Sequence, residues 1–371
     1  MRRLTGLRAL ALAAAGLVLA GCATTAADDV DSAWRPGYFW QSVRGHLGML
    51  AAARPVDAVM ADPATAPALR ARLALSREMR DYAVRALALP DNASYRRYAD
   101  LGRTAAVWNV VAAPELSLAL KTWCFPVLGC VGYRGYFDRT QAEQLAGALR
   151  ERGWEVNVYG VPAYSTLGKL PGAWFADPLL NTFVPQGEVD LARLIFHELA
   201  HQVAYAADDT TFNESYATAV ERLGSRQWLR DQGRTDLIEA SARQDRRRAE
   251  FRAMTMAARE RLDALYRSTA SDDDKRRQKA ELIAALRAEY ARWRDDQWAG
   301  DRAYDAWFDG VNNARLGVLA AYNQQVPAFE ALFEREGRDW PRFHAAVQAL
   351  TARPKAERDA ALAALGPPSD R

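Results

Sequence analysis

Two histidines four residues apart, with a glutamate beside the first, are the residues whose types and spacing best fit chemistry. The run is His197-Glu198-Leu199-Ala200-His201, and the whole chain contains four histidines. On a helix, residues i and i+4 project from the same face, so both imidazoles can bind a single tetrahedral Zn²⁺. Glu198 can accept a proton from the water molecule that attacks the substrate. The pattern predicts a zinc hydrolase, and the alternative is a chance match or a pair of satisfied core histidines.

Glu214 is the best candidate for a third zinc ligand. A catalytic zinc site needs three protein ligands and one open position, and no H-x-x-G-x-x-H continuation follows His201. A polar stretch and a second helix with apolar periodicity follow instead, and such a turn can bring Glu214 back to the histidines. The alternative is that Thr211 and Glu214 form a capping box, T-x-x-E, which opens that second helix.

The segment 213–221, Asn-Glu-Ser-Tyr-Ala-Thr-Ala-Val-Glu, resembles the N-E-x-[FY]-A-x-x-x-E run of aminopeptidase-N-type gluzincins. This resemblance implies that Glu214 is the zinc ligand and that Glu221 orients a histidine. A solvated charge beside Arg222 and Arg226 is the alternative for Glu221. The gap between the second histidine and the glutamate is shorter than in those enzymes, and their G-x-M-E-N motif is absent. Exopeptidase specificity therefore does not follow from this match.

Further short motifs lie across most of the chain. They are Tyr38-Phe39-Trp40-Gln41-Ser42, Gly135-Tyr136-Phe137, Tyr164-Ser165-Thr166-Leu167-Gly168, Asp177-Pro178-Leu179-Leu180, Asn312-Asn313-Ala314 and Val326-Pro327-Ala328-Phe329. Together with the amino-terminal signal described below, they resemble the predicted zinc aminopeptidase family of bacterial lipoproteins. This resemblance implies a zinc aminopeptidase whose substrates are short peptides. A zinc endopeptidase acting on envelope proteins, and a non-enzymatic assembly or chaperone-like lipoprotein with structural zinc, are the alternatives.

The amino terminus predicts a membrane-anchored lipoprotein. Arginines precede an apolar run within residues 1–21, which is too short to span a bilayer permanently and has the form of a lipoprotein signal peptide. It ends Leu-Ala-Gly-Cys, which resembles a lipobox with Cys22 as the lipidated first mature residue. Residues 22–35 would be a tether, and Ala23 suggests the periplasmic side of the outer membrane. An uncleaved anchor is the alternative.

The two remaining cysteines and the charge balance fit this location. Cys124 and Cys130 flank a short loop and predict a local disulfide in an oxidising compartment, with two free thiols as the alternative. The net charge of the chain is +3, and residues 1–21 hold three arginines and no acid, which leaves the mature part at 46 − 46 = 0. A neutral chain does not favour nucleic acid as a partner. The sequence does not indicate an oligomeric state.

The predicted fold is predominantly α with a small mixed β-sheet, a zincin-like catalytic core and a long helical hairpin insertion. Residues 36–225 would hold an N-terminal helical layer followed by the catalytic core. The helical layer is predicted to cover residues 36–122. Residues 226–300 would be a helical hairpin arm, and residues 301–371 a C-terminal helical part. Within the core, the sequence predicts one capped helix and three short strands. These are a helix from the capping box Thr140 and Glu143 to Gly153, and strands at Trp154–Tyr159, Ala163–Leu167 and Asn181–Val184.

Two segments could bind substrate. Residues 164–168, with Ser165 and Thr166, could be an edge strand that pairs with a peptide backbone, or an ordinary core strand. Tyr164 could donate a hydrogen bond to the oxyanion, in competition with Tyr304 and Tyr322. Paired asparagines, Asn312 and Asn313, could hydrogen-bond substrate or serve as polar packing between helices.

Overall fold

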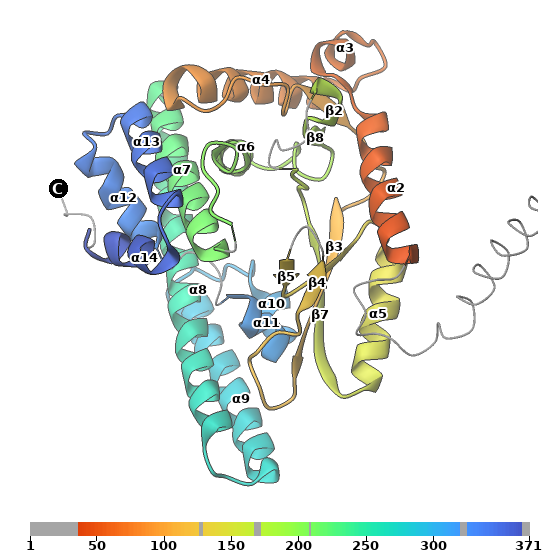
Figure 1. The fold of residues 1–371 in the computed structure, drawn as a ribbon, viewed down its shortest axis with the longest axis vertical. Coiled ribbons are helices and arrows are strands. Elements are labelled where there is room, and N and C mark those ends of the chain that lie inside the picture. The colour runs from red at the N-terminus through yellow and green to blue at the C-terminus, as the bar shows by residue number, and fades with distance from the viewer. Residues whose placement is uncertain (1–35, 126–128, 167–171, 208, 320–324, 366–371) are drawn as a thin grey trace, which may run out of the picture.

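The structure, a computed structural model, describes residues 36–125, 129–166, 172–207, 209–319 and 325–365 (Figure 1). It is mostly helical with small sheets, as the sequence predicts. The helices are α2 (Pro36–Ala52), α3 (Val56–Ala61), α4 (Pro67–Leu87), α5 (Arg139–Glu151), the 3-10 turn η1 (Ala173–Phe175), α6 (Glu188–Ala200), α7 (Thr210–Asp231), α8 (Thr235–Arg267), α9 (Asp272–Asp296), α10 (Asp305–Asp309), α11 (Asn313–Val318), α12 (Val326–Arg335), α13 (Trp340–Thr351) and α14 (Lys355–Ala363). The strands are β1 (Arg54–Pro55), β2 (Arg97–Ala99), β3 (Val107–Pro114), β4 (Trp123–Phe125), β5 (Gly129–Val131), β6 (Arg134–Tyr136), β7 (Trp154–Val161) and β8 (Leu179–Leu180).

The antiparallel sheet β6-β3-β7 corrects the prediction that residues 36–122 are all helical. Its central strand β3 is buried on both faces: Val110 packs toward α5, while Val111 packs with Ala314 of α11. A strand buried on both faces reads as a continuous apolar run, which periodicity cannot distinguish from a buried helix. β7 pairs with β3 along its full length and contains the predicted strand Trp154–Tyr159.

A second small sheet, β1-β2-β8, is mixed, with β1 antiparallel and β8 parallel to β2. The prediction of a strand at Asn181–Val184 is wrong, because β8 ends at Leu180 and turns follow. The Asn181 side chain bonds the backbone at Leu101 and Arg103, which ends the ladder there. Residues 163–166 also form no strand, and residue 167 lies outside the described residues.

The α5 helix is present as predicted, but a different residue caps it. The side chain of Asp138, not Thr140, accepts a hydrogen bond from the Gln141 amide at 3.0 Å. A carboxylate at this position satisfies a free amide and also suits the positive end of the helix dipole. The helix ends at Glu151, and Gly153 follows with φ +79°, which starts the turn into β7.

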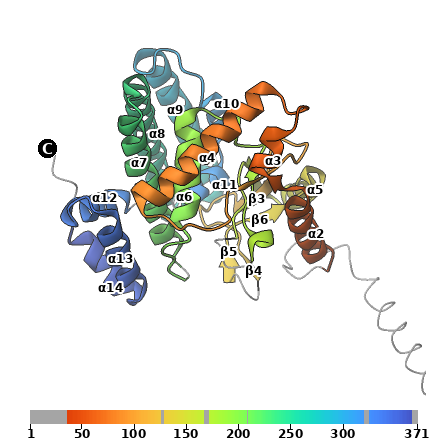
Figure 2. The same cartoon turned by 90° about the horizontal axis from the view of Figure 1, so that it is seen from above.

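The largest core surrounds the helix with the histidines. Leu191, Ile195 and Leu199 of α6 are fully buried at helical spacing and pack among residues of α4, α7, α12 and α13. The C-terminal helices α12–α14 lie on the opposite side of the molecule from α2, as both views show (Figures 1 and 2). The α6 helix is thereby held on several sides, which fixes the direction of its one polar stripe.

The predicted hairpin arm is present as α8 and α9, which extend together beyond the rest of the molecule (Figure 1), but it begins later than residue 226 because α7 continues to Asp231. Their apolar stripes pack together in one cluster that includes Phe251, Leu262, Leu286 and Tyr290. The arm is attached to the sheet, since Lys279 of α9 bonds the Glu115 carbonyl at 2.7 Å. No helix among the described residues combines the length and the apolar character needed to cross a bilayer.

Candidate metal centre

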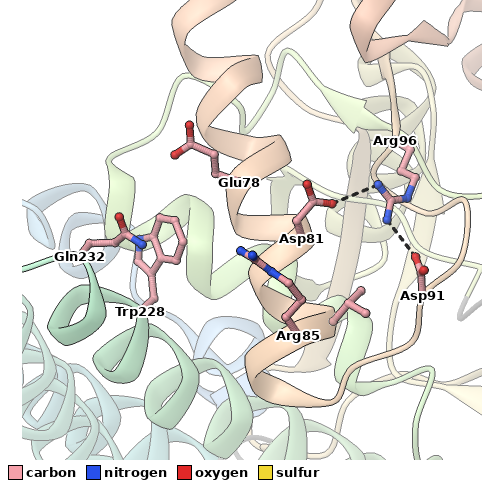
Figure 3. Close-up of a pocket in the computed structure, with 8 residues that line it drawn as sticks. Glu78, Asp81, Arg85, Asp91, Arg96, Trp228 and Gln232 are labelled. Atoms are coloured by element: carbon pink, nitrogen blue, oxygen red, sulfur yellow. Dashed lines mark hydrogen bonds and ion pairs between the residues drawn. The ribbon is translucent and has the colours of Figure 1, made fainter.

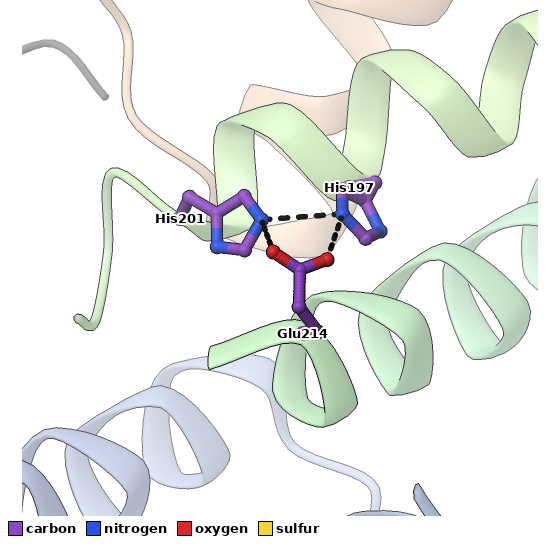
Figure 4. Close-up of side chains that lie close together, drawn as sticks. All are labelled: His197, His201 and Glu214. Atoms are coloured by element: carbon purple, nitrogen blue, oxygen red, sulfur yellow. Dashed lines mark hydrogen bonds and ion pairs between the residues drawn. The ribbon is translucent and has the colours of Figure 1, made fainter. Parts of the chain in front are cut away.

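Three side chains that the sequence singles out converge in the structure, two from α6 and one from α7 (Figure 4). The Nε2 atoms of His197 and His201 lie 3.2 Å apart. One Glu214 carboxylate oxygen lies 3.4 Å from Nε2 of His197, and the other lies 3.7 Å from Nε2 of His201. Each residue therefore turns one ligand atom toward a common point between the two helices.

The spacing of these atoms fits a tetrahedral zinc ion. Zinc binds imidazole nitrogen and carboxylate oxygen at about 2.0 to 2.2 Å, so ligand atoms at the corners of a tetrahedron are about 3.3 to 3.5 Å apart. The two imidazole nitrogens, 3.2 Å apart, are close to this range, and different oxygens of Glu214 lie 3.4 and 3.7 Å from them; with one ligand atom from each residue, all three lie within 4.8 Å of one another. Two imidazoles and one carboxylate are also the ligand types of catalytic zinc sites with an open fourth position. The residues thus fit the metal that the sequence predicts.

The turn between α6 and α7 explains how Glu214 returns to the histidines. Asp209 caps α7 by accepting a hydrogen bond from the Phe212 amide at 3.2 Å, so the alternative capping box of Thr211 and Glu214 is not the one used. The buried Asn213 side chain bonds both the amide and the carbonyl of Ala206, at 2.7 and 2.8 Å. These two bonds, which we call the Asn213 clasp, fold the turn back onto the start of α7.

Glu221 lies on the same face of α7 as Glu214 and contacts the other nitrogen of His197. Its carboxylate is 2.9 Å from Nδ1, which leaves Nε2 directed at the predicted metal position. A carboxylate partner of this kind fixes the orientation and tautomer of a ligand histidine. The distance favours the orienting role for Glu221 over that of a solvated charge. Nδ1 of His201, in contrast, is buried without a protein partner in the described structure.

The two histidines have opposite electrostatic environments. Burial opposes a charge on His197, but hydrogen bonding to Glu214 and Glu221 outweighs it and raises the pKa of His197 well above its usual range. Burial lowers the pKa of His201 to about 4, helped by the neighbouring His197 charge. The pKa of Glu214 lies below its usual value, because the contacts with His197 outweigh the opposing effect of burial. The centre therefore favours one positive charge between its carboxylates, which a metal cation also supplies.

Glu198 lies on α6 between the two histidines in sequence and is partly buried. Burial raises the pKa of its carboxyl group to about 7, and the charges of Glu214 and Asp177 act in the same direction. The His197 charge and a hydrogen bond from Ser165 oppose this shift. A carboxyl group that titrates near neutral pH can both accept and donate a proton during a reaction.

The other sequence-predicted residues have different surroundings. The Ser165 hydroxyl and the Thr166 amide and hydroxyl all bond Asp177, so these groups serve the protein's own structure and not a free strand edge. Among the described residues, the Tyr164 ring contacts His46 and Phe137 and not the two site histidines. Of its competitors, Tyr304 stacks on Phe251 in the arm at 4.4 Å. Tyr322 lies outside the described residues.

The paired asparagines match the polar-packing alternative and not the substrate-binding prediction. Asn312 caps α11 and donates to the Val156 carbonyl of β7 at 3.2 Å. Asn313 is fully buried, donates to the carbonyls of Pro114 and Glu115, and accepts from the Tyr266 hydroxyl. These amides connect α11 to the sheet and to the arm, which leaves the Asn313 side chain no exposed donor for a substrate.

The predicted disulfide forms in the structure, where Cys124 and Cys130 are bonded across the β4–β5 hairpin. Three residues near the centre have no role in the sequence analysis: Asp177 and Asn213 appear there only within motifs, and Tyr205 does not appear. Tyr205 is 42% exposed and contacts the His201 ring, with 6.5 Å between ring centres. Tyr205 follows the end of α6 in a segment without helical structure, so no periodic signal in the sequence indicates this contact.

A surface hollow of about 410 Å³ lies between α4 and α7, away from the histidines (Figure 3). Its charged residues largely pair with one another: Arg96 binds Asp81 at 3.3 Å and Asp91 at 2.8 Å. Trp228, which also lines it, follows Glu214 on α7 by about four turns. None of its lining residues belongs to the metal centre, so we do not assign the chemistry to this hollow.

One known protein family matches nearly the whole chain. A family model described as "Putative aminopeptidase" matches residues 37–362, which include every helix and strand that contributes to the centre. The chain belongs to this aminopeptidase family. No curated protein and no solved structure matches it significantly. The aminopeptidase family match thus covers both the metal centre and the helical arm, and it is the comparison on which a proposed activity can rest.

Proposed function

We propose that this protein is a zinc-dependent peptidase that removes residues from the amino termini of short peptides in the cell envelope. The observation that carries the proposal is the convergence of His197, His201 and Glu214, whose ligand atoms lie within 4.8 Å of one another. Membership of the aminopeptidase family supports peptide hydrolysis as the reaction. His197, His201 and Glu214 would hold the metal, and a fourth position would remain for water and substrate.

The chain's own residues supply the proton transfers. When bound, zinc would act as a Lewis acid toward water and toward the scissile carbonyl. Glu198 would accept the proton of the attacking water and deliver it to the leaving amine, a role that suits its raised pKa. Glu221 would keep the His197 ring in place throughout.

We also propose a location for this activity. Cys22 would carry the lipid, and the chain from residue 36 onward would face the periplasm, with the outer membrane as the anchoring bilayer. The Cys124–Cys130 disulfide supports an oxidising compartment. Peptide fragments in the envelope are then the substrates within reach of the enzyme.

The test is metal analysis together with hydrolysis of a mixed peptide library by the protein purified from membranes in detergent. We expect one zinc per chain and stepwise loss of single amino-terminal residues. Glu198→Gln should keep the zinc and lower kcat by about 10³-fold, because it removes the proton acceptor. Glu239→Gln, on the exposed side of α8, is the matched control and should behave as wild type.

Other outcomes have definite meanings. Internal cleavage instead of amino-terminal trimming would replace the aminopeptidase proposal by that of an endopeptidase. Zinc without cleavage, repeated with envelope-derived peptides, would favour a structural metal in a binding protein. Protein isolated without zinc, and unable to take it up, would contradict the metal centre itself.

A further inference from the structure

The solvent side of α2 carries large apolar side chains and almost no polar ones. Phe39 is 63% exposed, Trp40 is 67% exposed and Leu47 is 40% exposed. Among residues 37–52, the exposed positions form what we call the outer face of α2: Gly37, Phe39, Trp40, Arg44, Leu47, Gly48, Ala51 and Ala52. A surface helix normally turns polar side chains to water, so an apolar exposed face of this kind indicates an interaction site.

The opposite side of α2 is fixed to the protein, so the outer face cannot turn inward. The Gln41 side chain donates to the Gly135 carbonyl at 3.4 Å and accepts from the Phe137 amide at 3.2 Å, beside the edge strand β6. The Arg134 guanidinium lies 4.1 Å from the centre of the Tyr38 ring. The packing of the helix itself therefore leaves the apolar side chains of the outer face exposed.

The place of α2 in the chain points to a lipid bilayer as the partner of this face. The helix begins at Pro36, 14 residues after Cys22, the proposed site of lipid attachment. Even a fully extended chain of this length spans at most about 50 Å, so a lipid on Cys22 keeps α2 near the bilayer. Tryptophan favours the boundary between lipid and water, and phenylalanine and leucine enter the outer part of the acyl region. Arg44, the one charged residue of the face, can meet lipid phosphate.

We propose that the outer face of α2 lies in the interface of the membrane that holds the protein. The inference rests on the proposed function for the location, because the lipid brings this face and the bilayer together. The lipid provides the attachment, and the face determines which side of the protein rests on the bilayer. Since α12–α14 lie on the opposite side of the molecule, they would be directed away from the membrane (Figures 1 and 2).

The test measures how deeply nitroxide labels on single introduced cysteines lie in a membrane. The full-length acylated protein is reconstituted in vesicles of phosphatidylethanolamine and phosphatidylglycerol, as Arg44→Cys, Leu47→Cys or Asp273→Cys. Asp273 is the control, since its side chain is 94% exposed on α9 in the arm. Oxygen concentrates in lipid, and a nickel chelate stays in water. At positions 44 and 47 we expect the ratio of oxygen to chelate collisions to be at least about threefold higher than at position 273.

Three results would overturn the inference. Equal collision ratios at the three positions would place the outer face in water. Dipolar broadening that disappears on dilution with unlabelled protein would show that the face contacts a second copy of the chain. Labels at positions 44 and 47 that are shielded from both oxygen and chelate would show that the protein covers this face itself.

A second measurement tests the aromatic side chains of the face. In labelled Arg44→Cys, Phe39→Ser together with Trp40→Ser should bring the collision ratio down to that of position 273. Tyr133→Ser is the matched control and should leave the ratio unchanged, because Tyr133 is a 43% exposed aromatic residue outside α2. An unchanged ratio in the double substitution would overturn the inference, provided that its melting temperature matches wild type.

Mass spectrometry of the purified protein separates this inference from the proposed location. If Cys22 carries no lipid, the proposed location fails. The labels at positions 44 and 47 then still decide the inference, measured on the same protein mixed with an excess of vesicles. Immersion of both labels would support membrane contact by α2 without the lipid, and labels in water would overturn it.

Discussion

Glu221 and His197 are joined by a 2.9 Å contact that crosses from α7 to α6. The same imidazole is approached by Glu214 at its other nitrogen, at 3.4 Å. Two carboxylates seven residues apart on one helix therefore hold the two nitrogens of a single ring. This arrangement sets the ring plane by hydrogen bonding and would leave Nε2 for the proposed metal ion.

Replacing Glu221 by glutamine should weaken zinc binding about 10- to 100-fold, because the amide loses the charge that orients His197 and raises its basicity. Zinc affinity measured by competition with a chromogenic chelator tests this. Glu330→Gln is the control, since Glu330 contacts Arg222 and Arg226 but neither histidine. An unchanged affinity in Glu221→Gln would return Glu221 to the status of a solvated charge.

The buried ion pair of Arg193 with Asp245 links the metal helix to the arm. Arg193 of α6 donates to Asp245 of α8 at 2.8 Å, and both side chains are at least 90% buried. Asp245→Asn should lower the free energy of unfolding by about 3 kcal/mol, because it leaves a buried guanidinium without its partner charge. Chemical denaturation measures this loss. The exposed pair of Arg267 and Asp263 is the control, where Asp263→Asn should change stability by less than about 1 kcal/mol.

His344 should make stability depend on pH. Burial lowers its pKa, and its ring lies between the Tyr216 hydroxyl and the Leu87 carbonyl, at 2.8 and 2.9 Å. Since the folded pKa is below the unfolded value of about 6.5, the unfolded chain binds more protons in acid. The neutral His344 ring therefore contributes fully to the free energy of unfolding above pH 6.5, and this contribution is lost as the pH falls toward the folded pKa.

The measurement is the free energy of unfolding at several pH values in chelator, for wild type and His344→Gln. Wild type should lose up to about 1.4 kcal/mol more per pH unit than the variant below pH 6.5. If the free energy of unfolding depends on pH equally in the two proteins, His344 is not the group that takes up the proton on unfolding. The comparison cancels the other titrating groups, because both proteins share them.

Cys22→Ser should release the protein from the membrane. The lipid on this residue is the proposed anchor, and no helix of the described residues can cross a bilayer. Fractionation of cells, with metabolic labelling by a fatty acid, measures both attachment and acylation. Retention of the unlabelled variant in the membrane fraction would instead favour an uncleaved signal as the anchor.

Local helix geometry is the reason that the sequence could predict which side chains converge at the candidate centre. His197 and His201 share a helix face, and so do Glu214 and Glu221, so the 3.6-residue repeat determines each pair in advance. Only the turn between the helices had to be assumed, and the Asn213 clasp provides it. The hairpin arm was predictable for the same reason.

Contacts between distant segments could not be predicted in this way. Asp177 bonds Ser165 and Thr166 between two loops that have no periodic signal, and these partners are determined by the packing of the whole core. The strand β3 was misread because burial on both faces removes the alternation that identifies a strand. Sequence pattern thus indicates the candidate ligands and Glu221, which lie on helices, but not the partners that come from loops.

The Asn213 clasp bears on the stage at which the proposed zinc ion would bind. Its two hydrogen bonds to Ala206 join side chain and backbone only, so the return of α7 toward α6 needs no ion. In the proposed periplasmic zinc enzyme, the chain would therefore fold before zinc binds and would remain as a stable, inactive reserve while zinc is scarce. Loading would then follow the zinc supply of the compartment, and cells recovering from zinc starvation could regain activity without making new protein.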